Sequence, residues 1–204
     1  MELRERIINE NFRLLTTKSA KAITMDELAS NLGISKRTLY ENFSDKKTLL
    51  EECLLNFLNK NKQESEKIWN ESENAMVAFI TYMQKANDLM NTIGFDLIMD
   101  IKKYFPDIFA HTFEKNMDDH RTCTLNSINT AISQGLIKKS TNIDFLINMI
   151  QLNMTYATGQ EYILRNPNYT ASSLANAHLY IILRGFATYE GIKILDQYDN
   201  IFLK

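Results

Sequence analysis

Glycine and proline are rare in this chain, and their scarcity limits the folds that it can adopt. Only six glycines and two prolines occur in 204 residues, about a third of their combined share in an average protein. An all-β sandwich or barrel needs turn residues every 8–12 positions or so, so the composition disfavours such folds. The glycine-rich phosphate loops G-x-G-x-x-G and G-x-x-x-x-G-K-[ST] do not occur in the sequence either.

Apolar residues recur at steps of three and four along most of the chain, as the faces of amphipathic helices do. The first segment shows the pattern with Leu3, Ile7, Ile8, Phe12 and Leu15. We expect about nine helices, near residues 3–15, 25–32, 36–43, 45–61, 72–91, 93–103, 106–133, 143–165 and 171–195. The sequence therefore predicts an all-α fold, with a three-helix headpiece followed by a C-terminal helical bundle.

Targeting and membrane signals are weak in this sequence. The longest purely apolar runs are short, as at residues 75–80, so no membrane span is expected. The opening residues 1–6 carry too many charges for a secretory signal. Cys53 and Cys123 lie far apart and form no disulfide or metal pattern, which suits a reducing compartment. We expect a soluble protein of the cytoplasm.

The most specific local pattern is a pair of short helices around a glycine. Thr24 and Glu27 have the spacing of a capping box, which predicts the start of a helix. Gly33 fits the end of that helix, and Ser35 fits the start of the next. Two short helices joined by a glycine-containing turn are typical of a helix-turn-helix.

The second helix of the pair has polar residues at the positions that should be exposed. They are Ser35, Lys36, Arg37, Thr38, Tyr40 and Glu41, a mixture of cations, hydroxyls and one aromatic ring that suits contacts with bases and phosphates. Residues 1–50 carry nine Lys/Arg and seven Asp/Glu, whereas the whole chain has a net charge of −2. The small positive surplus is therefore confined to the part of the chain that holds this motif.

The order and spacing of these residues resemble the N-terminal motif of the tetracycline-repressor-like (TetR) transcriptional regulators. The resemblance covers about residues 5–52 and rests on residues 23–29, 32–35 and 38–40, on Phe43, and on residues 46–50. The chain departs from the family at Ser19-Ala20, where a glycine and an aromatic residue are usual, and at Leu15, where Phe is common. These departures concern the turn after the first helix, not the second helix of the motif.

The resemblance implies a role for each matching residue. Thr24, at a helix start, should bind a phosphate. Lys36 and Arg37 should face the major groove, where arginine reads guanine with two hydrogen bonds. Glu41 should face away from the DNA or pair with a lysine, and Leu39 and Phe43 should be core. The candidate DNA contacts are Thr24, Ser35, Lys36, Arg37, Thr38, Tyr40 and Lys46.

The resemblance also implies two functional domains and a homodimer. Residues 1–47 should form the DNA-binding domain, and residues 48–204 the ligand-binding and dimerisation domain. A single headpiece makes few contacts, so a dimer that reads two half-sites of a pseudo-palindromic operator is expected. The candidate dimer contacts lie on the last helix and are Leu179, Ile182, Leu183, Phe186 and Tyr189; the alternative is that this apolar stripe is intramolecular core.

Regulators of this family usually respond to a small molecule held in the C-terminal domain. The sequence suggests a neutral or hydrophobic effector, because the apolar helix faces of this domain carry few charges. The candidate lining residues are Phe79, Met83, Met90, Phe95, Met99, Phe113 and Met117, with Gln151, Asn153 and Tyr156 as polar contacts. Ordinary core packing is the competing interpretation of each.

Enzymatic and metal-dependent functions find little support in the sequence. His120 and Cys123 share a helix face near Asp118 and Asp119, but a metal site needs three or four ligands in place. We expect no metal, no cofactor and no catalytic residue. The main prediction is a repressor that a ligand releases from DNA. An activator of the same family, and a helical enzyme or protein-interaction module with a vestigial headpiece, remain the alternatives.

Overall fold

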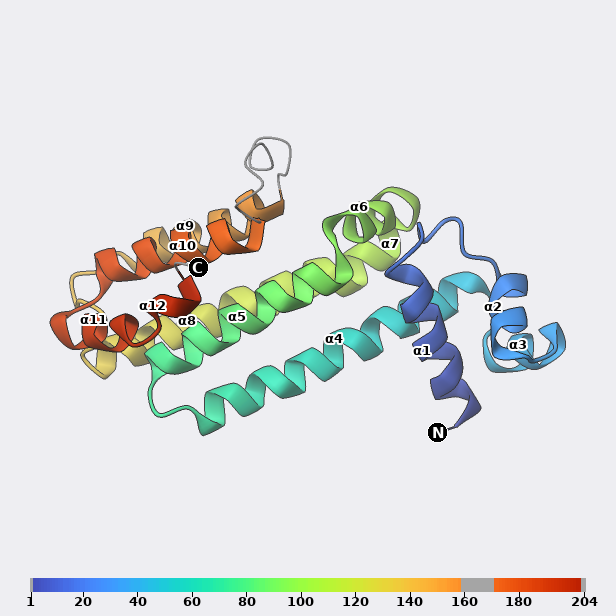
Figure 1. Ribbon diagram of the computed structural model, residues 1–204, viewed down its shortest axis with the longest axis horizontal. Coiled ribbons are helices and arrows are strands. Elements are labelled where there is room, and N and C mark those ends of the chain that lie inside the picture. Colours follow the sequence, from blue (N-terminus) through green and yellow to red (C-terminus); the bar gives the residue numbers. More distant parts are fainter. Residues whose placement is uncertain (1, 159–170, 203–204) are drawn as a thin grey trace. The chain divides into compact units, whose positions relative to one another are not determined.

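The computed structural model describes residues 2–158 and 171–202, and the regular elements in these ranges are all helices (Figure 1). The all-α fold class is therefore confirmed. The elements are α1 (Leu3–Leu15), α2 (Met25–Leu32), α3 (Lys36–Asn42), α4 (Lys46–Glu71), α5 (Ala75–Ile93), α6 (Phe95–Tyr104), α7 (Pro106–Phe109), the π-helix η1 (Ala110–Glu114), α8 (Lys115–Ser133), α9 (Ile143–Thr158), α10 (Ala171–Phe186), α11 (Tyr189–Asp196) and α12 (Asp199–Phe202).

Helix starts and ends follow local signals in the sequence. The carboxylate of Asp45 accepts a hydrogen bond of 2.8 Å from the backbone N–H of Thr48 and so caps α4, which runs ten residues past the expected end at Asn61. The amide oxygen of Asn74 caps α5 through the N–H groups of Met76 and Val77. Gly94 and Gly135 adopt positive φ angles of 74° and 73° beside the ends of their helices.

The helix expected over residues 106–133 forms along its whole length but contains one wider turn. Pro106 occupies its first turn, where a missing N–H group is harmless. Residues Ala110–Glu114 then make a π-helix between α7 and α8. The hydroxyl of Thr112 donates a hydrogen bond of 2.6 Å to the carbonyl oxygen of Ile108 within this turn. Such single π turns are frequent at functional sites.

The expectation of one unbroken helix over residues 171–195 is wrong. The backbone N–H of Thr188 bonds to the carbonyl oxygen of Leu136 at 2.9 Å instead of continuing α10. The hydroxyl of Thr188 then caps α11 by accepting a bond from the N–H of Gly191 at 3.2 Å. The helix breaks because a long-range partner replaces the local one.

Contacts divide the chain into two compact units. Unit 1 comprises residues 1–64 and 89–118, and unit 2 comprises residues 65–88 and 119–204, so α4, α5 and α8 each contribute residues to both. None of the helices in the part of the chain that the structure describes is long and apolar enough to cross a membrane.

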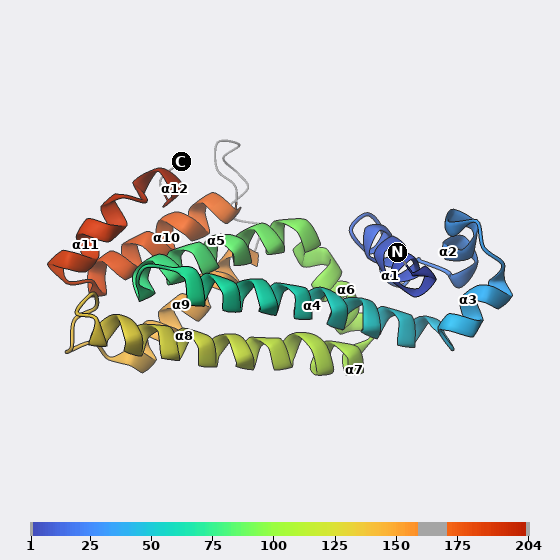
Figure 2. The same cartoon turned by 90° about the horizontal axis from the view of Figure 1, so that it is seen from below.

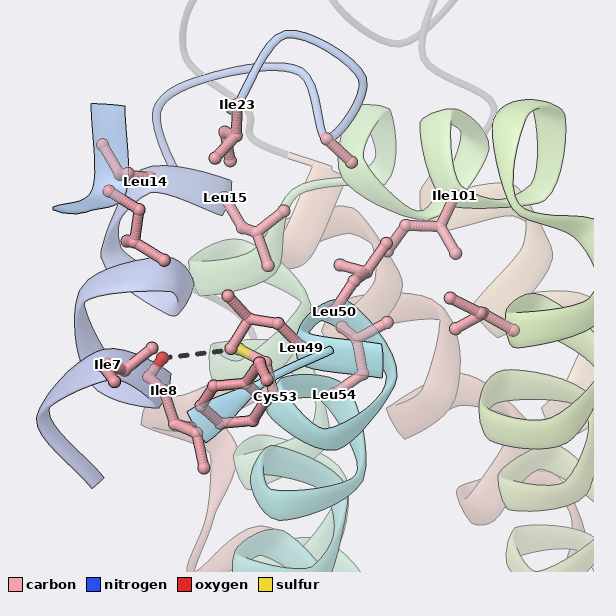
Figure 3. Close-up of a cluster of buried hydrophobic side chains, with 14 of the residues drawn as sticks. Ile7, Ile8, Leu14, Leu15, Ile23, Leu49, Leu50, Cys53, Leu54 and Ile101 are labelled. Atoms are coloured by element: carbon pink, nitrogen blue, oxygen red, sulfur yellow. Dashed lines mark hydrogen bonds between the residues drawn. The ribbon is translucent and has the colours of Figure 1, made fainter. Parts of the chain in front are cut away.

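The core of unit 1 joins the first four helices to α6, α7 and η1. Figure 3 shows side chains of α1 and α4 packed together, with Ile23 and Ile101 among the neighbouring residues. The thiol of Cys53 donates a hydrogen bond of 3.5 Å to the carbonyl oxygen of Ile8 inside this cluster. Phe109 and Phe113 complete the core, so residues far beyond the headpiece help to hold it.

The core of unit 2 lies between parts of α5, α8, α9, α10 and α11. Met76, Phe79 and Ile80 of α5 are buried there, together with Ile128 of α8 and Leu179 of α10. Helices α9 and α10 pack against each other (labelled in Figures 1 and 2).

Candidate nucleic-acid interface

The turn between α2 and α3 has the backbone geometry that its sequence predicts. Gly33 has φ 64° and ψ 31°, the left-handed conformation that ends many helices. The N–H groups of Gly33 and Ile34 bond to the carbonyl oxygens of Ser30 and Ala29 at 3.1 and 3.0 Å. The hydroxyl of Ser35 then accepts a bond of 3.0 Å from the N–H of Thr38 and caps α3. The turn therefore fixes the direction in which α3 leaves α2.

Four side chains attach α3 to the rest of the headpiece. Leu28, Ala29, Leu39 and Phe43 are all at most 2 % exposed and belong to the core of unit 1. The expected core positions Leu39 and Phe43 are thus confirmed. A helix anchored along one side keeps its other side available for a ligand.

The free side of α3 carries the polar residues that the sequence singled out. Ser35, Lys36, Arg37 and Tyr40 are exposed, and the Arg37 side chain is 88 % exposed. Thr38 is half-buried, and its hydroxyl lies 2.8 Å from that of Ser35. Five of the candidate DNA contacts therefore lie together, four on this short helix and one, Ser35, at its N-cap.

Both cations of α3 are paired with carboxylates. Lys36 forms an ion pair with Asp26 of α2. The Nε atom of Arg37 donates a hydrogen bond of 2.9 Å to Oε1 of Glu41, one helical turn later. Glu41 was expected to face away or to pair with a lysine; its partner is instead an arginine. Asp26 had no assigned role, because only the fold brings α2 and α3 together.

Thr24 lies at the start of α2, as expected. Its hydroxyl accepts a hydrogen bond of 3.1 Å from the N–H of Glu27 and so caps the helix. The carboxylate of Glu27 pairs with Lys18, whose hydrogen bond lowers the pKa of that carboxyl below its usual range. The Thr24 side chain remains exposed beside the first N–H groups of α2.

Lys46 is held differently from the other candidate contacts. Its ammonium group donates a hydrogen bond of 2.9 Å to the carbonyl oxygen of Lys21 and lies 5.7 Å from the ring centre of Phe105. The side chain is half-buried, and desolvation lowers the pKa of Lys46. Its expected contact with a phosphate remains a prediction, whereas its structural contact with the turn after α1 is direct.

Arg4 is a headpiece residue that the sequence analysis missed. Its guanidinium group pairs with Glu52 of α4, donates to the carbonyl oxygen of Asn42, and lies 4.2 Å from the ring centre of Phe43. It therefore fastens the end of α3 to α1 and α4. No spacing rule could identify it, because its partners follow 38 and 48 residues later.

The candidate effector contacts do not converge on one surface. Phe79 and Met83 are buried in the core of unit 2, and Phe113 is buried in that of unit 1. Met99 and Met117 are 39 % and 65 % exposed. The amide oxygen of Gln151 accepts a hydrogen bond of 2.7 Å from Arg121. The remaining candidates lie outside the described side chains; they are Met90, Phe95, Asn153 and Tyr156.

The candidate dimer contacts divide between the core and the surface. Leu179, Ile182 and Leu183 are buried within unit 2, so these three side chains belong to the intramolecular core. Phe186 is half-buried beside Phe145, with ring centres 6.3 Å apart. Tyr189 is 73 % exposed.

An aromatic cluster in unit 2 contains two buried ring nitrogen atoms. They are Nε1 of Trp69 and Nε2 of His120. The ring of Tyr82 lies between these residues, with its centre 5.9 Å from that of Trp69 and 5.0 Å from that of His120. Burial lowers the pKa of His120, which favours its neutral form.

The neighbours of the two rings differ. The hydroxyl of Thr124 donates to the backbone oxygen of His120 at 2.9 Å and lies 3.4 Å from Nδ1 of its ring. Trp69 interacts with the thiol of Cys123, where it partly offsets the rise in pKa that burial causes. The buried group of this cluster that lacks a partner among the described residues is therefore Nε2 of His120.

Comparisons with known proteins agree with the geometry of the headpiece. Residues 7–53 match the family model described as bacterial regulatory proteins, tetR family. The chain is 27 % identical over 187 residues to YvaF of Bacillus subtilis (strain 168), an uncharacterized HTH-type transcriptional regulator; the match covers 91 % of this chain and 96 % of that protein.

Solved structures resemble the whole chain in fold. A TetR-family transcriptional regulator from Marinobacter aquaeolei VT8 has a TM-score of 0.74 at 13 % identity, over 97 % of this chain and 99 % of that one. FadR of Bacillus subtilis, solved in complex with stearoyl-CoA, has a TM-score of 0.69 at 14 % identity, over 89 % and 98 %. The headpiece of this chain thus matches the tetR family model, and the fold of the chain is similar to that of a solved TetR-family transcriptional regulator.

Proposed function

We propose that this protein is a transcriptional regulator of the tetR family, a repressor that binds a pseudo-palindromic operator as a homodimer and leaves it when a small molecule binds. The observation that carries the DNA-binding role is the free side of α3, where Lys36, Arg37 and Tyr40 are exposed on a helix whose other side is anchored in the core. Such a helix can enter the major groove, and its side chains are of the kinds that contact bases and phosphates.

The dimer surface that we propose is the exposed side of α9 and α10. Ile181 is 65 % exposed, Phe145 54 % and Leu152 51 %. Large apolar side chains exposed on two packed helices favour burial against another surface. A second copy would present the same patch, as a two-fold interface requires. Ile181 therefore replaces Leu179, Ile182 and Leu183 as the residue of α10 on which we expect the dimer to depend.

The proposed effector site is in unit 2, and it must open before a ligand enters. The cavity between α5, α8 and Leu183 has about 10 Å³, room for about one water molecule. Elsewhere in unit 2, the buried Nε2 atom of His120 lacks a hydrogen-bond partner among the described residues, which favours a ligand with a polar group. FadR of Bacillus subtilis, which has a similar fold, was solved in complex with stearoyl-CoA, and this supports a ligand with a large hydrophobic part.

Ligand binding would act on DNA binding through helices shared by both units. A ligand shifts a conformational equilibrium only if it binds one state more tightly than the other. A ligand that separates α5 from α8 favours the open state, because the closed one has no room for it. The core of unit 1 includes Ile101, Phe109 and Phe113, so a movement of α6–α8 would change the support of the headpiece. In this proposal residues 1–47 read DNA, and residues 48–204 bind effector and dimerise.

A selection experiment tests this function directly. Purified full-length protein is mixed with fragmented genomic DNA, and the retained fragments are sequenced. We expect enrichment of one pseudo-palindromic sequence, including DNA upstream of the protein's own gene. The double variant Lys36→Ala/Arg37→Ala, with unchanged helix content, should lose this enrichment. If the wild-type protein retained no sequence above background, the chain would not be a sequence-specific DNA-binding protein.

A further inference from the structure

Carboxylates accompany both cations on the free side of α3. Lys36 pairs with Asp26, and Arg37 pairs with Glu41. A carboxylate near DNA repels the phosphates, so its presence on a helix that faces the groove weakens general attraction. Simple charge considerations thus give Glu41 no useful role at this position.

The hydrogen bond between Arg37 and Glu41 constrains the guanidinium group. Nε of Arg37 donates to Oε1 of Glu41 at 2.9 Å. Residues four apart share a helix face, so the pair stands on the same exposed side of α3. The Arg37 side chain is 88 % exposed. Within the described part of the chain, its polar contact is this bond to Glu41.

One edge of the guanidinium group is left for a ligand. Guanine offers two acceptors in the major groove, and arginine meets them with two parallel N–H bonds. The planar guanidinium group has five N–H donors in a fixed arrangement. Because Glu41 occupies the Nε edge, the Nη1–Nη2 edge of Arg37 remains for a base. The bond to Glu41 also restricts rotation of the side chain, so less freedom is lost when a base is bound.

We propose, on the basis of the function proposed above, that Glu41 is a positioning residue for DNA specificity. It holds the guanidinium group of Arg37 with its Nη1–Nη2 edge toward a guanine of the operator. Glu41 itself need not touch DNA. It decreases general affinity through its charge and increases the ratio of operator affinity to affinity for unrelated DNA.

Two variants of equal charge separate this role from simple repulsion. Glu41→Gln and Glu41→Ala both remove one negative charge, so both should bind unrelated DNA more tightly by the same factor. Glutamine keeps an oxygen that can accept the bond from Nε of Arg37, whereas alanine does not. A positioning role therefore predicts that the two variants differ in specificity, and repulsion alone predicts that they do not.

The experiment uses full-length protein and three kinds of DNA duplex. They are the operator obtained from the genomic selection, the same operator with each G·C pair of a half-site replaced in turn by A·T, and a shuffled duplex. Fluorescence anisotropy gives the affinity for each. Glu71→Gln is the matched control, because Glu71 also forms an exposed ion pair with a cation four residues away, Lys67, but lies at the other end of α4.

We expect Glu41→Ala to lower the ratio of operator affinity to shuffled-duplex affinity on the order of tenfold. The lost discrimination should concern one G·C position of each half-site, so replacement of that pair by A·T should weaken binding less in this variant than in the wild type. Glu41→Gln should lie between this variant and the wild type, and Glu71→Gln should equal the wild type. In the Arg37→Ala background, Glu41→Ala should change the ratio no further.

Other results distinguish the failure of this inference from that of the proposed function. If the wild type selects an operator but Glu41→Ala and Glu41→Gln keep its specificity ratio, Glu41 only repels phosphates and the positioning role is wrong. The positioning role is also wrong if Glu41→Ala lowers the ratio of operator to shuffled affinity by the same factor in the wild-type and in the Arg37→Ala background. If the wild type binds no DNA selectively, the proposed function and this inference fail together.

Discussion

The ammonium nitrogen of Lys46 lies 2.9 Å from the carbonyl oxygen of Lys21 and donates a hydrogen bond to it. This contact ties the start of α4 to the segment between α1 and α2. The neighbouring residue Ser19 bonds to Asp100 of α6, and Lys21 lies 4.7 Å from the ring centre of Tyr104. The segment that departs from the usual family sequence is thus held by polar contacts with α4 and α6.

Replacement of Lys46 should therefore reduce stability as well as any contact with DNA. Lys46→Ala removes the half-buried charged donor of the bond to the carbonyl oxygen of Lys21, and we expect the free energy of unfolding to fall by about 1 kcal/mol. Lys47→Ala is the control, because Lys47 pairs with Asp107 on the surface and should matter little. Urea denaturation checks both variants. Equal stabilities of Lys46→Ala and the wild type would show that the contact with Lys21 contributes nothing.

The turn before α3 should depend on the left-handed conformation of Gly33. Apart from Gly33 and its neighbours along the chain, no heavy atom of the described residues lies within 4 Å of a Cβ atom placed here, so mainly the backbone conformation opposes a side chain. We expect Gly33→Ala to destabilise the protein by about 1 kcal/mol. Gly33→Asn should lose less, because asparagine tolerates this conformation better. Thermal or urea denaturation gives the order, and a more stable alanine variant would contradict it.

The local signals of the headpiece predicted its helices well. Thr24, Gly33 and Ser35 act through residues no more than four or five positions away, so their spacing contains the necessary information. The break at Thr188 could not be predicted in this way, because its partner Leu136 lies 52 residues earlier in the chain. A stretch of residues with helical periodicity conceals a break that only the tertiary fold imposes.

Functional surfaces were harder to predict than helices. Periodicity showed that one side of the last long helix is apolar, but it does not distinguish a core from an interface between subunits. Leu179 and Leu183 lie in the core, whereas the neighbouring Ile181 is exposed. Asp26 and Arg4 acquire their roles through contacts between different helices, and the sequence alone gives no sign of these contacts.

Burial of His120 should make stability depend on pH. Its pKa in the folded state is below the ordinary value of 6.5, so at pH values below about 6.5 the unfolded chain binds a proton that the folded chain does not. Stability is therefore fully present above pH 6.5 and falls as the pH decreases toward the folded-state pKa, by up to about 1.4 kcal/mol per pH unit.

The variant His120→Gln should remove this contribution, and the exposed His111→Gln should keep it. Urea denaturation between pH 7.5 and 5 can be followed by the fluorescence of Trp69, the one tryptophan of the sequence. The difference in stability between the wild type and His120→Gln should change with pH in this range. A difference that stays constant would show that His120 titrates normally in the folded protein.

The proposed dimer surface makes a direct prediction about Ile181. A charge at this position should oppose burial against a second copy, so Ile181→Glu should sediment as a monomer at micromolar concentration, where the wild type is a dimer. Met117→Glu is the matched control, because both side chains are 65 % exposed but Met117 is on α8. If Ile181→Glu stayed a dimer, the interface would lie elsewhere. If the wild type were a monomer, the proposed interface would be excluded.

Sequence-specific DNA binding through α3 is tested most directly by fluorescence anisotropy over a series of salt concentrations. The probes are DNA from immediately upstream of the protein's own gene and a shuffled duplex of the same length. We predict saturable binding by the wild type that weakens as salt rises and favours the upstream DNA, and a loss of this preference in folded Arg37→Ala. Equal affinity of the wild type for both duplexes, or the same preference in Arg37→Ala, would contradict the proposed role of α3.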